Sequence, residues 1–424
     1  MKKSLLYLIL LVSPPYAFAD LTWAPASYAP KESFLATKYF TPELRLDAVY
    51  HHSFNHPSDG TISGSSEVLR HGELQLTQIG VGGDFTYGNV GFRIMTQFGL
   101  YSTATPRNDA SPSRGQWNLD SAYRYISEAY ASYHLDVLEG INLQAGIFMS
   151  YIGLWSYYNF DNWTYQPSYV SSNTPWFFNG VRAQIFPNEK LKIEPWIVNG
   201  WQSYGRFNNQ PGLGVQVLYR PNERLSMVGN QYYGADTLNN PARKRLHSDN
   251  SIMWKYYESP GATVSKSAAS LTLDLGCEDG GGVSCGSQYF LGFMAYNRTW
   301  ILDDTVGITF GGGYIKNPGR YLVILPPING ATAFSGTPYF TANPGDDYSA
   351  WDVQLTADYL VTPNLTFRLE FNHRWASVPY FTGPGGVTPP GGNSGTPGSD
   401  PGGGWSPDLR QAEDRLTLGM LVRL

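Results

Sequence analysis

Residues 365–372, LTFRLEFN, decide the fold class of this 424-residue chain. Four apolar side chains in this stretch alternate with four polar or charged ones, namely Leu365, Phe367, Leu369 and Phe371 against Thr366, Arg368, Glu370 and Asn372. Because successive side chains of a β-strand point to opposite faces, one face of this strand suits lipid and the other suits water. The pattern predicts an amphipathic strand of either a membrane β-barrel or a soluble β-sandwich.

Stretches with this alternation recur from one end of the chain to the other. Residues 90–100, VGFRIMTQFGL, repeat it, and about 16 such strands can be counted. We keep 14 and 18 strands as alternatives, because the pattern between residues 224 and 275 is poorly periodic. The expected strands are residues 43–53, 73–86, 90–101, 123–135, 141–152, 176–186, 191–201, 212–220, 224–234, 246–258, 264–275, 287–297, 304–316, 349–360, 365–375 and 412–424.

The connections between these strands are alternately short and long. The short ones are residues 88–89, 136–140, 187–190, 221–223, 259–263, 298–303 and 361–364. The long ones are the loop that contains both cysteines and residues 54–72, 102–122, 153–175, 317–348 and 376–411. Short periplasmic turns and long outer loops are typical of bacterial outer-membrane barrels. We therefore predict an all-β fold, a transmembrane antiparallel up-and-down β-barrel with both chain ends on the periplasmic side.

The two ends of the chain agree with this prediction. Lys2 and Lys3 precede an apolar run at residues 5–12 and a small-x-small site at residues 17–19, which is the pattern of a signal peptide. We expect residues 1–19 to be the signal peptide, 20–42 a periplasmic segment and 43–424 the barrel. The last strand alternates in polarity up to Leu424, so the barrel-assembly machinery is an expected partner, although such strands commonly end in Phe or Trp.

Composition excludes a helical membrane protein and argues against a nucleic-acid-binding protein. Charged and aromatic residues make up 15% each, mean hydropathy is −0.29, and the longest apolar run after the signal peptide is residues 321–328. That run is far shorter than the roughly 20 residues that a membrane helix needs. Loss of Lys2 and Lys3 lowers the net charge of −5 by two, and no basic run is present, so nucleic acid is not an expected partner.

Cys277 and Cys285 lie in the stretch CEDGGGVSC, and we expect a disulfide across this loop tip in an oxidising compartment. A metal site is disfavoured because no His or further Cys stands at ligand spacing from these thiols. We expect no cofactor and no bound metal.

Four stretches carry a resemblance to a known family. They are ISEAYASYHL at residues 126–135, INLQAGIFMSYIG at 141–153, NTPWFFNGVRAQI at 173–185 and IVNGW at 197–201. Together they resemble the OmpL-like β-barrel porins, clearly over residues 44–201 and more loosely beyond. The resemblance implies an outer-membrane barrel of poorly defined substrate. The sequence departs from the family pattern in two places. Leu154 and Trp155 follow Gly153, where an acidic residue is expected, and the Gly/Pro loop near residue 390 is enlarged.

Strand positions opposite the apolar face are the candidate pore-lining residues. They are Arg45, Arg93, Arg124, Glu128, Arg182, Lys192, Glu194, Lys255, Arg368, Glu370 and Arg415. Rings of such charges can set ion preference, or the charges can pair with one another and brace the wall. We expect a weak preference for anions or none.

The loop at residues 153–175 is the candidate constriction loop, because a long aromatic loop can fold into a porin lumen. Its aromatic residues are Trp155, Tyr157, Tyr158, Trp163 and Tyr165. The alternative is that the same loop packs on itself as an extracellular cap.

The predicted function is that of an outer-membrane porin that passes small hydrophilic solutes or ions. A non-conducting barrel with an adhesive or structural role is the alternative. A lipid hydrolase is disfavoured because residues 247–250, HSDN, alternate between opposite faces of a strand and cannot form a triad by themselves. Outer-membrane lipid and lipopolysaccharide are expected partners, and a homotrimer stays open because many 16-stranded porins trimerise.

Overall fold

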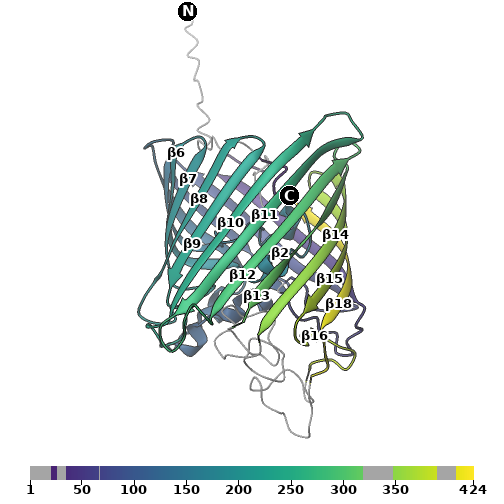
Figure 1. Ribbon diagram of the computed structural model, residues 1–424. Helices are drawn as coiled ribbons and strands as arrows, with labels where there is room; N and C mark the ends of the chain where they lie inside the picture. The colour runs from purple at the N-terminus through teal and green to yellow at the C-terminus, as the bar shows by residue number, and fades with distance from the viewer. Residues whose placement is uncertain (1–20, 26–34, 66, 319–346, 389–406) are drawn as a thin grey trace, which may run out of the picture.

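The computed structural model describes residues 21–25, 35–65, 67–318, 347–388 and 407–424, and these form a closed antiparallel barrel (Figure 1). Each wall strand pairs with its neighbours along the chain, and β1 closes the barrel on β18. The wall consists of β1 (Phe40–Ser53), β2 (Leu74–Tyr87), β3 (Val90–Thr96), β4 (Ile126–Leu135), β5 (Ile141–Met149), β6 (Phe177–Asn188), β7 (Leu191–Val198), β8 (Gly212–Asn222), β9 (Leu225–Gly234), β10 (Lys244–Glu258), β11 (Val264–Asp279), β12 (Tyr289–Ile301), β13 (Val306–Asn317), β14 (Tyr348–Thr362), β15 (Leu365–Ala376) and β18 (Ala412–Arg423).

The prediction of 16 antiparallel strands in an up-and-down barrel is confirmed, including the three poorly periodic strands β9 to β11. The remaining elements are small and lie in the connections. They are α1 (Tyr101–Ala104), η1 (Thr105–Asn108), η2 (Ser111–Ser113), α2 (Leu119–Tyr123), η3 (Asn159–Asp161), α3 (Tyr169–Ser172) and the paired β16 (Phe381–Thr382) and β17 (Leu409–Arg410). No helix in the described part of the chain has both the length and the apolar character needed to cross a bilayer.

The strand predicted at residues 90–101 is wrong at its outer end, since β3 stops at Thr96. Gly99 takes a φ of 94°, and a Cβ there would lie 2.5 Å from the carbonyl oxygen of Leu76. The chain leaves the sheet at this close approach and continues as α1. Other strand ends differ by up to four residues, most notably at β12, which extends to Ile301 through a region predicted to be a turn.

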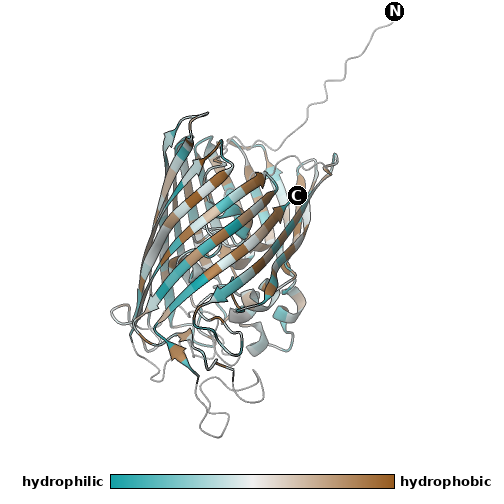
Figure 2. Cartoon of the chain, turned by 90° about the vertical axis from the view of Figure 1, so that its right-hand side faces the viewer, coloured by the Kyte–Doolittle hydropathy of each residue, from teal (hydrophilic) through white to brown (hydrophobic). Residues whose placement is uncertain are grey.

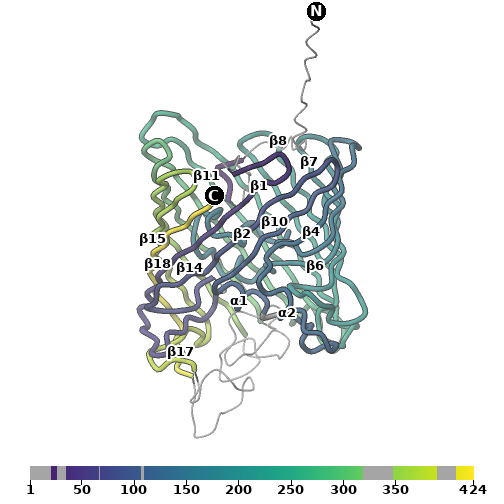
Figure 3. The backbone as a smooth tube through the Cα atoms, turned by 180° about the vertical axis from the view of Figure 1, so that it is seen from behind, coloured from purple at the N-terminus to yellow at the C-terminus, as the bar shows by residue number. Residues whose placement is uncertain are grey.

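The seam of the barrel shows which end is periplasmic. Phe40, at the start of β1, pairs with Phe85 beside the short turn at residues 88–89, and Leu44 exchanges backbone hydrogen bonds with Leu424. The start of β1 and the end of β18 therefore lie at the rim that carries the short turns, which is the periplasmic rim of such a barrel. Figure 3 shows β1 beside β18, with α1 and α2 at the opposite, outer end.

Side chains divide between the two faces as the alternation predicts. On β15 Leu369 is 45% exposed on the outer face, whereas Arg368 is 3% exposed and Glu370 is fully buried inside. Hydrophobic and hydrophilic residues alternate along the strands of the wall in Figure 2. The polar face thus turns toward the lumen and the apolar face toward lipid.

We expect Leu369→Arg, which places a charge on the lipid-facing middle of β15, to destabilise the barrel by about 2–4 kcal/mol. The matched control is Leu138→Arg in the periplasmic turn after β4, where Leu138 is 64% exposed and a surface change shifts stability by about 0.5 kcal/mol or less. Guanidinium unfolding of the barrel in lipid vesicles measures both. Equal losses of stability would mean that Leu369 does not face lipid.

Candidate functional site

The lumen of the barrel is occupied by the connection between β5 and β6. This connection, residues 150–176, is called the inward segment below. Most of its residues are buried although it leaves the outer end of the wall, and it includes η3 and α3. It turns inward at Gly153, whose φ is 100°, and a Cβ at Gly153 would lie 3.0 Å from Oγ1 of Thr174 near the return to β6. The segment therefore runs into the barrel and is not an extracellular cap.

Arg368 on β15 fixes the middle of the inward segment. Its guanidinium donates to the carbonyl oxygens of Asn159 at 3.1 Å and Asn162 at 2.6 Å. The same guanidinium pairs with Asp358 on β14 at 2.7 Å, and Asp358 also pairs with Arg298 on β12 at 2.7 Å. One carboxylate thus holds two guanidinium groups. Both also donate to the backbone of the inward segment, because the Arg298 guanidinium donates to the Trp163 carbonyl oxygen at 3.2 Å.

Carboxylates of the wall bind the backbone N–H groups that follow. Glu370 accepts from the amides of Tyr165 at 2.5 Å and Gln166 at 3.1 Å, and Asp352 accepts from the amide of Tyr169 at 2.8 Å. Backbone donors buried without partners destabilise a fold by roughly 1–3 kcal/mol each. These contacts explain how a loop without regular structure can cross the interior of the barrel.

Asp161 connects the inward segment to the seam of the barrel. Its carboxylate pairs with Arg45 on β1 at 2.8 Å and with Arg423 on β18. Arg45 also lies over the ring of Tyr158 at 4.0 Å and pairs with Glu43. Both strands that close the barrel therefore contact the segment.

Two further charge clusters line the wall on the side of β1 to β7. Arg93 pairs with Glu43 and Glu128 at 2.9 Å and with Asp84 at 2.8 Å. In the second cluster Glu194 pairs with Arg182 at 3.0 Å and with Lys192 at 2.6 Å. Charged side chains of opposite sign thus pair with one another along the inner wall.

The predicted pore-lining residues lie on the inner face with one exception. Arg124 is not on a strand: it follows α2 at the outer end and pairs with Asp120, because β4 begins only at Ile126. Lys255 faces inward near the periplasmic end and pairs with Glu258 at 2.7 Å. Arg415 is fully buried between Glu413 and Gln166 of the inward segment. Most of the inward set is thus buried in ion pairs or against the inward segment.

The aromatic residues of the inward segment pack against the wall and against one another. Trp155 meets Trp163 at 6.1 Å and Tyr296 of β12 at 4.9 Å between ring centroids, and Trp163 meets Trp300 of β12 at 5.9 Å. Tyr157 hydrogen-bonds Gln97, and Tyr158 donates to Glu128 at 2.7 Å. All five of the predicted constriction-loop aromatics are buried.

Two other connections contact each other at the outer end of the barrel. Asp109, after η1, accepts from the Ser203 hydroxyl at 2.7 Å and from the amide of Tyr204 at 2.8 Å. Gln202 donates to the Thr105 carbonyl oxygen at 3.1 Å. These contacts join the connection after β3 to the connection after β7 above the inward segment.

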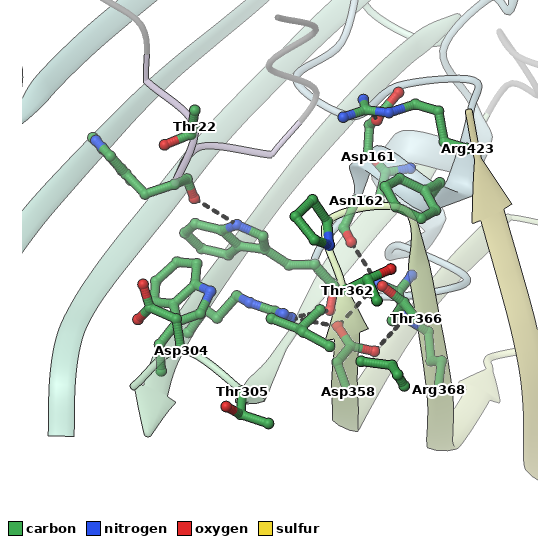
Figure 4. Close-up of a pocket in the computed structure, with 18 of the residues that line it drawn as sticks. Thr22, Asp161, Asn162, Asp304, Thr305, Asp358, Thr362, Thr366, Arg368 and Arg423 are labelled. Carbon is green, nitrogen blue, oxygen red and sulfur yellow. Dashed lines mark hydrogen bonds and ion pairs between the residues drawn. The ribbon is translucent and has the colours of Figure 1, made fainter. Parts of the chain in front are cut away.

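A pocket of about 500 Å³ opens between the inward segment and the periplasmic rim (Figure 4). Figure 4 shows Asp161 and Asn162 of the segment on one side, with Asp358 and Arg368 of the wall below and Thr22 at the upper edge. Asp304, in the periplasmic turn after β12, also lines it. Burial opposes ionisation there, but hydrogen bonds from Lys266 and Ser265 outweigh it and hold the pKa of Asp304 below its ordinary value.

A short stretch near the N-terminus closes part of this pocket. Leu21, Trp23 and Ala24 are almost fully buried. The Trp23 indole donates to the Glu223 carbonyl oxygen in the turn after β8, and the Trp163 indole donates to the Trp23 carbonyl oxygen, both at 3.0 Å. Residues 21–25 thus contact the inward segment, whereas the sequence predicted only a periplasmic segment here. Trp23 and Arg298 are site residues that the sequence analysis missed, the latter because residues 298–303 were predicted to be a turn.

The other candidate chemistry lies elsewhere. Cys277 and Cys285 form a disulfide at the outer end of β11. On β10 His247 and Asp249 point inward, whereas Ser248 and Asn250 point outward, so this run forms no triad by itself. Within the described ranges no group of His, Cys, Asp and Glu could hold a metal ion.

A closed barrel with a polar lumen and an apolar outer wall defines an outer-membrane protein of the porin type. The model of the family "Putative beta-barrel porin-2, OmpL-like" matches residues 40–394, and the chain belongs to that family. The match to this family also indicates that the protein is located in the Gram-negative outer membrane. No curated protein matches the sequence.

Two solved structures share the fold at low identity. The outer membrane channel DcaP of Acinetobacter baumannii is 12% identical with a TM-score of 0.52, covering 93% of this chain and 100% of its own. The anion-selective porin from Comamonas acidovorans is 9% identical with a TM-score of 0.51, covering 91% and 99%. At this identity the similarity concerns the fold alone.

Replacement of Arg368 by Met is expected to destabilise the barrel by about 3–5 kcal/mol, because it leaves part of the Asp358 charge and two segment carbonyls buried without their partner. The matched control is Arg124→Met at the outer rim, where the pair with Asp120 is partly exposed and is worth about 0–1 kcal/mol. Guanidinium unfolding in vesicles measures both variants. Similar values for the two arginines would contradict the proposed anchoring.

Proposed function

We propose that this barrel is a restricted diffusion porin, in which small hydrophilic solutes or ions pass between the inner wall and the inward segment. The observation that carries the proposal is a polar lumen inside a 16-stranded barrel, crossed by a loop that polar contacts hold on several sides. A barrel of this size is wide enough for an aqueous channel. The inward segment would narrow that channel and set the size limit.

We further propose that ion selectivity is weak. Around the periplasmic pocket Arg298 and Arg368 share Asp358, while Arg423 pairs with Asp161. These three arginines and two aspartates sum to a single positive charge, and so small a net charge favours one sign of ion only weakly. A weak anion preference or none is the expected outcome in recordings with ion substitution.

A second candidate function is a structural barrel that does not conduct. The observation that favours it is the extent to which the inward segment and residues 21–25 fill the described lumen. Interactions with lipopolysaccharide and with the assembly machinery through β18 fit either function. The absence of conductance would favour the structural role.

Planar-bilayer recording tests the porin proposal. We expect small conductance steps for the natural protein and larger steps for Trp163→Ala, because Trp163 of the inward segment contacts both Trp300 of the wall and Trp23 and fills space in the lumen. Trp117→Ala is the control, since Trp117 is 84% exposed in an outer loop and its loss should leave the steps unchanged. Silence of both the natural protein and Trp163→Ala would refute conduction through this lumen.

We also propose that residues 1–19 are removed and that the mature chain begins at Asp20. The support is the burial of Leu21 and Trp23, which places the first residues after the predicted cleavage site against the inward segment. Intact-mass measurement of protein purified from outer membranes should give the mass of residues 20–424. A mass that includes the leader would contradict this assignment.

A further inference from the structure

The lipid-facing wall of β9 and β10 carries a group of polar side chains. Gln231 lies on the outer face of β9, and Ser248 and Asn250 lie on the outer face of β10, which is the wall turned toward the viewer in Figure 1. These three residues are called the outer polar cluster. The pairing of Ser248 with Gln231 and of Asn250 with Gly229 brings them together on adjacent strands.

The cluster lies in the apolar belt and not at its edge. Asn250 stands four residues from the outward Trp254 toward the periplasm and four residues from the outward Leu246 toward the outer rim. Leu246 pairs with Tyr233, and aromatic residues such as Tyr233 and Trp254 mark the two interfaces of a membrane barrel. Asn250 is therefore close to the middle of the belt.

The neighbours on the same face are apolar. Val215 on β8 pairs with Gln231, and Leu275 and Leu273 on β11 pair with Ser248 and Asn250. Toward the periplasm Met227 and Ile252 follow as an outward pair. An acyl chain seated on this wall would cover amide groups with hydrocarbon, which offers no hydrogen bond.

The hydrogen bonds inside the cluster leave part of its capacity unused. The Gln231 and Asn250 amide nitrogens each donate to the Ser248 hydroxyl oxygen at 2.8 Å. Among the described residues no acceptor of the chain binds the second N–H of either amide, and each amide oxygen remains an acceptor. The cluster thus offers both donors and acceptors on one surface.

The surface around the cluster is also flat enough for close contact. Gly229 has no side chain, and a Cβ there would lie 3.2 Å from Oδ1 of Asn250. The Asn250 amide therefore lies over Gly229, close to the backbone of the sheet. A second flat wall can approach such a surface without displacing bulky side chains.

We propose that the outer polar cluster is a contact between two copies of this chain, in which the cluster of one barrel meets the same cluster of another. The cluster is complementary to itself because amides pair with amides by mutual donation and acceptance. Other outward polar groups of the described wall lie toward the strand ends, as Asn297 does beside Tyr256 and as the pair His373–Asp414 does near the outer rim. Within the described wall, a second barrel at the same depth in the membrane therefore offers matching donors and acceptors only at its own outer polar cluster.

Site-directed crosslinking tests this contact in native outer membranes. The chain contains only two cysteines, which are joined to each other, so a cysteine introduced by Asn250→Cys is the single free thiol. We expect mild oxidation to convert a large share of Asn250→Cys into a covalent dimer. Asn297→Cys, on the same outer wall near the periplasmic turn, is the matched control and should give at least several-fold less.

The double variant Gln231→Leu with Asn250→Leu separates association from folding. Leucine suits the lipid face, so we expect the barrel to fold with an unchanged far-ultraviolet spectrum while the oligomer seen by light scattering in mild detergent is lost. A natural protein that is monomeric, a leucine variant that keeps its oligomer, or equal crosslinking at positions 250 and 297 would each overturn the proposal. Such a failure would leave the conductance test of the porin function untouched, because the cluster is on the outer face.

Discussion

The constraint on which this structure depends is that backbone polar groups in lipid must find partners within the chain. A closed antiparallel barrel meets it, since every wall strand pairs on both sides and β1 returns to β18. Closure also fixes the direction of every side chain, because residues of each strand alternate between lipid and lumen. The apolar outer face and the charged inner face are two consequences of one pairing pattern.

The charged inner face in turn determines what the lumen contains. Carboxylates and guanidinium groups removed from bulk water need partners, and the inward segment supplies backbone carbonyls to Arg368 and backbone amides to Glu370. The segment needs these groups equally, because it has little regular structure of its own. Wall and segment therefore stabilise each other, and the space left free in the lumen is set by their contacts rather than by the number of strands alone.

The fold could be predicted from the sequence because its signal is local. Alternation in residues 365–372 and in similar stretches identifies the strands, and loop lengths identify the two ends of the barrel. β9 to β11 were the weak point. The outward Gln231, Ser248 and Asn250 explain this for β9 and β10, since polar side chains on the lipid face interrupt the alternation.

The site was predictable only in part. The charged inner residues and the aromatic loop were identified by type and position, but the sequence could not decide between a cap and an inward loop. The groups that hold the loop, such as Glu370 beneath Tyr165, are about 200 residues away from it in the chain. Trp23 was missed for the same reason, since its partners Glu223 and Trp163 lie 200 and 140 residues away in the chain.

The central claim is that solutes pass through a lumen narrowed by the inward segment. Liposome swelling with sugars of graded size measures this most directly, because it reports both permeation and its size limit. We predict rapid swelling with a monosaccharide and a steep fall in rate toward a trisaccharide. Swelling with no sugar, or at the same rate for all sizes, would contradict the account.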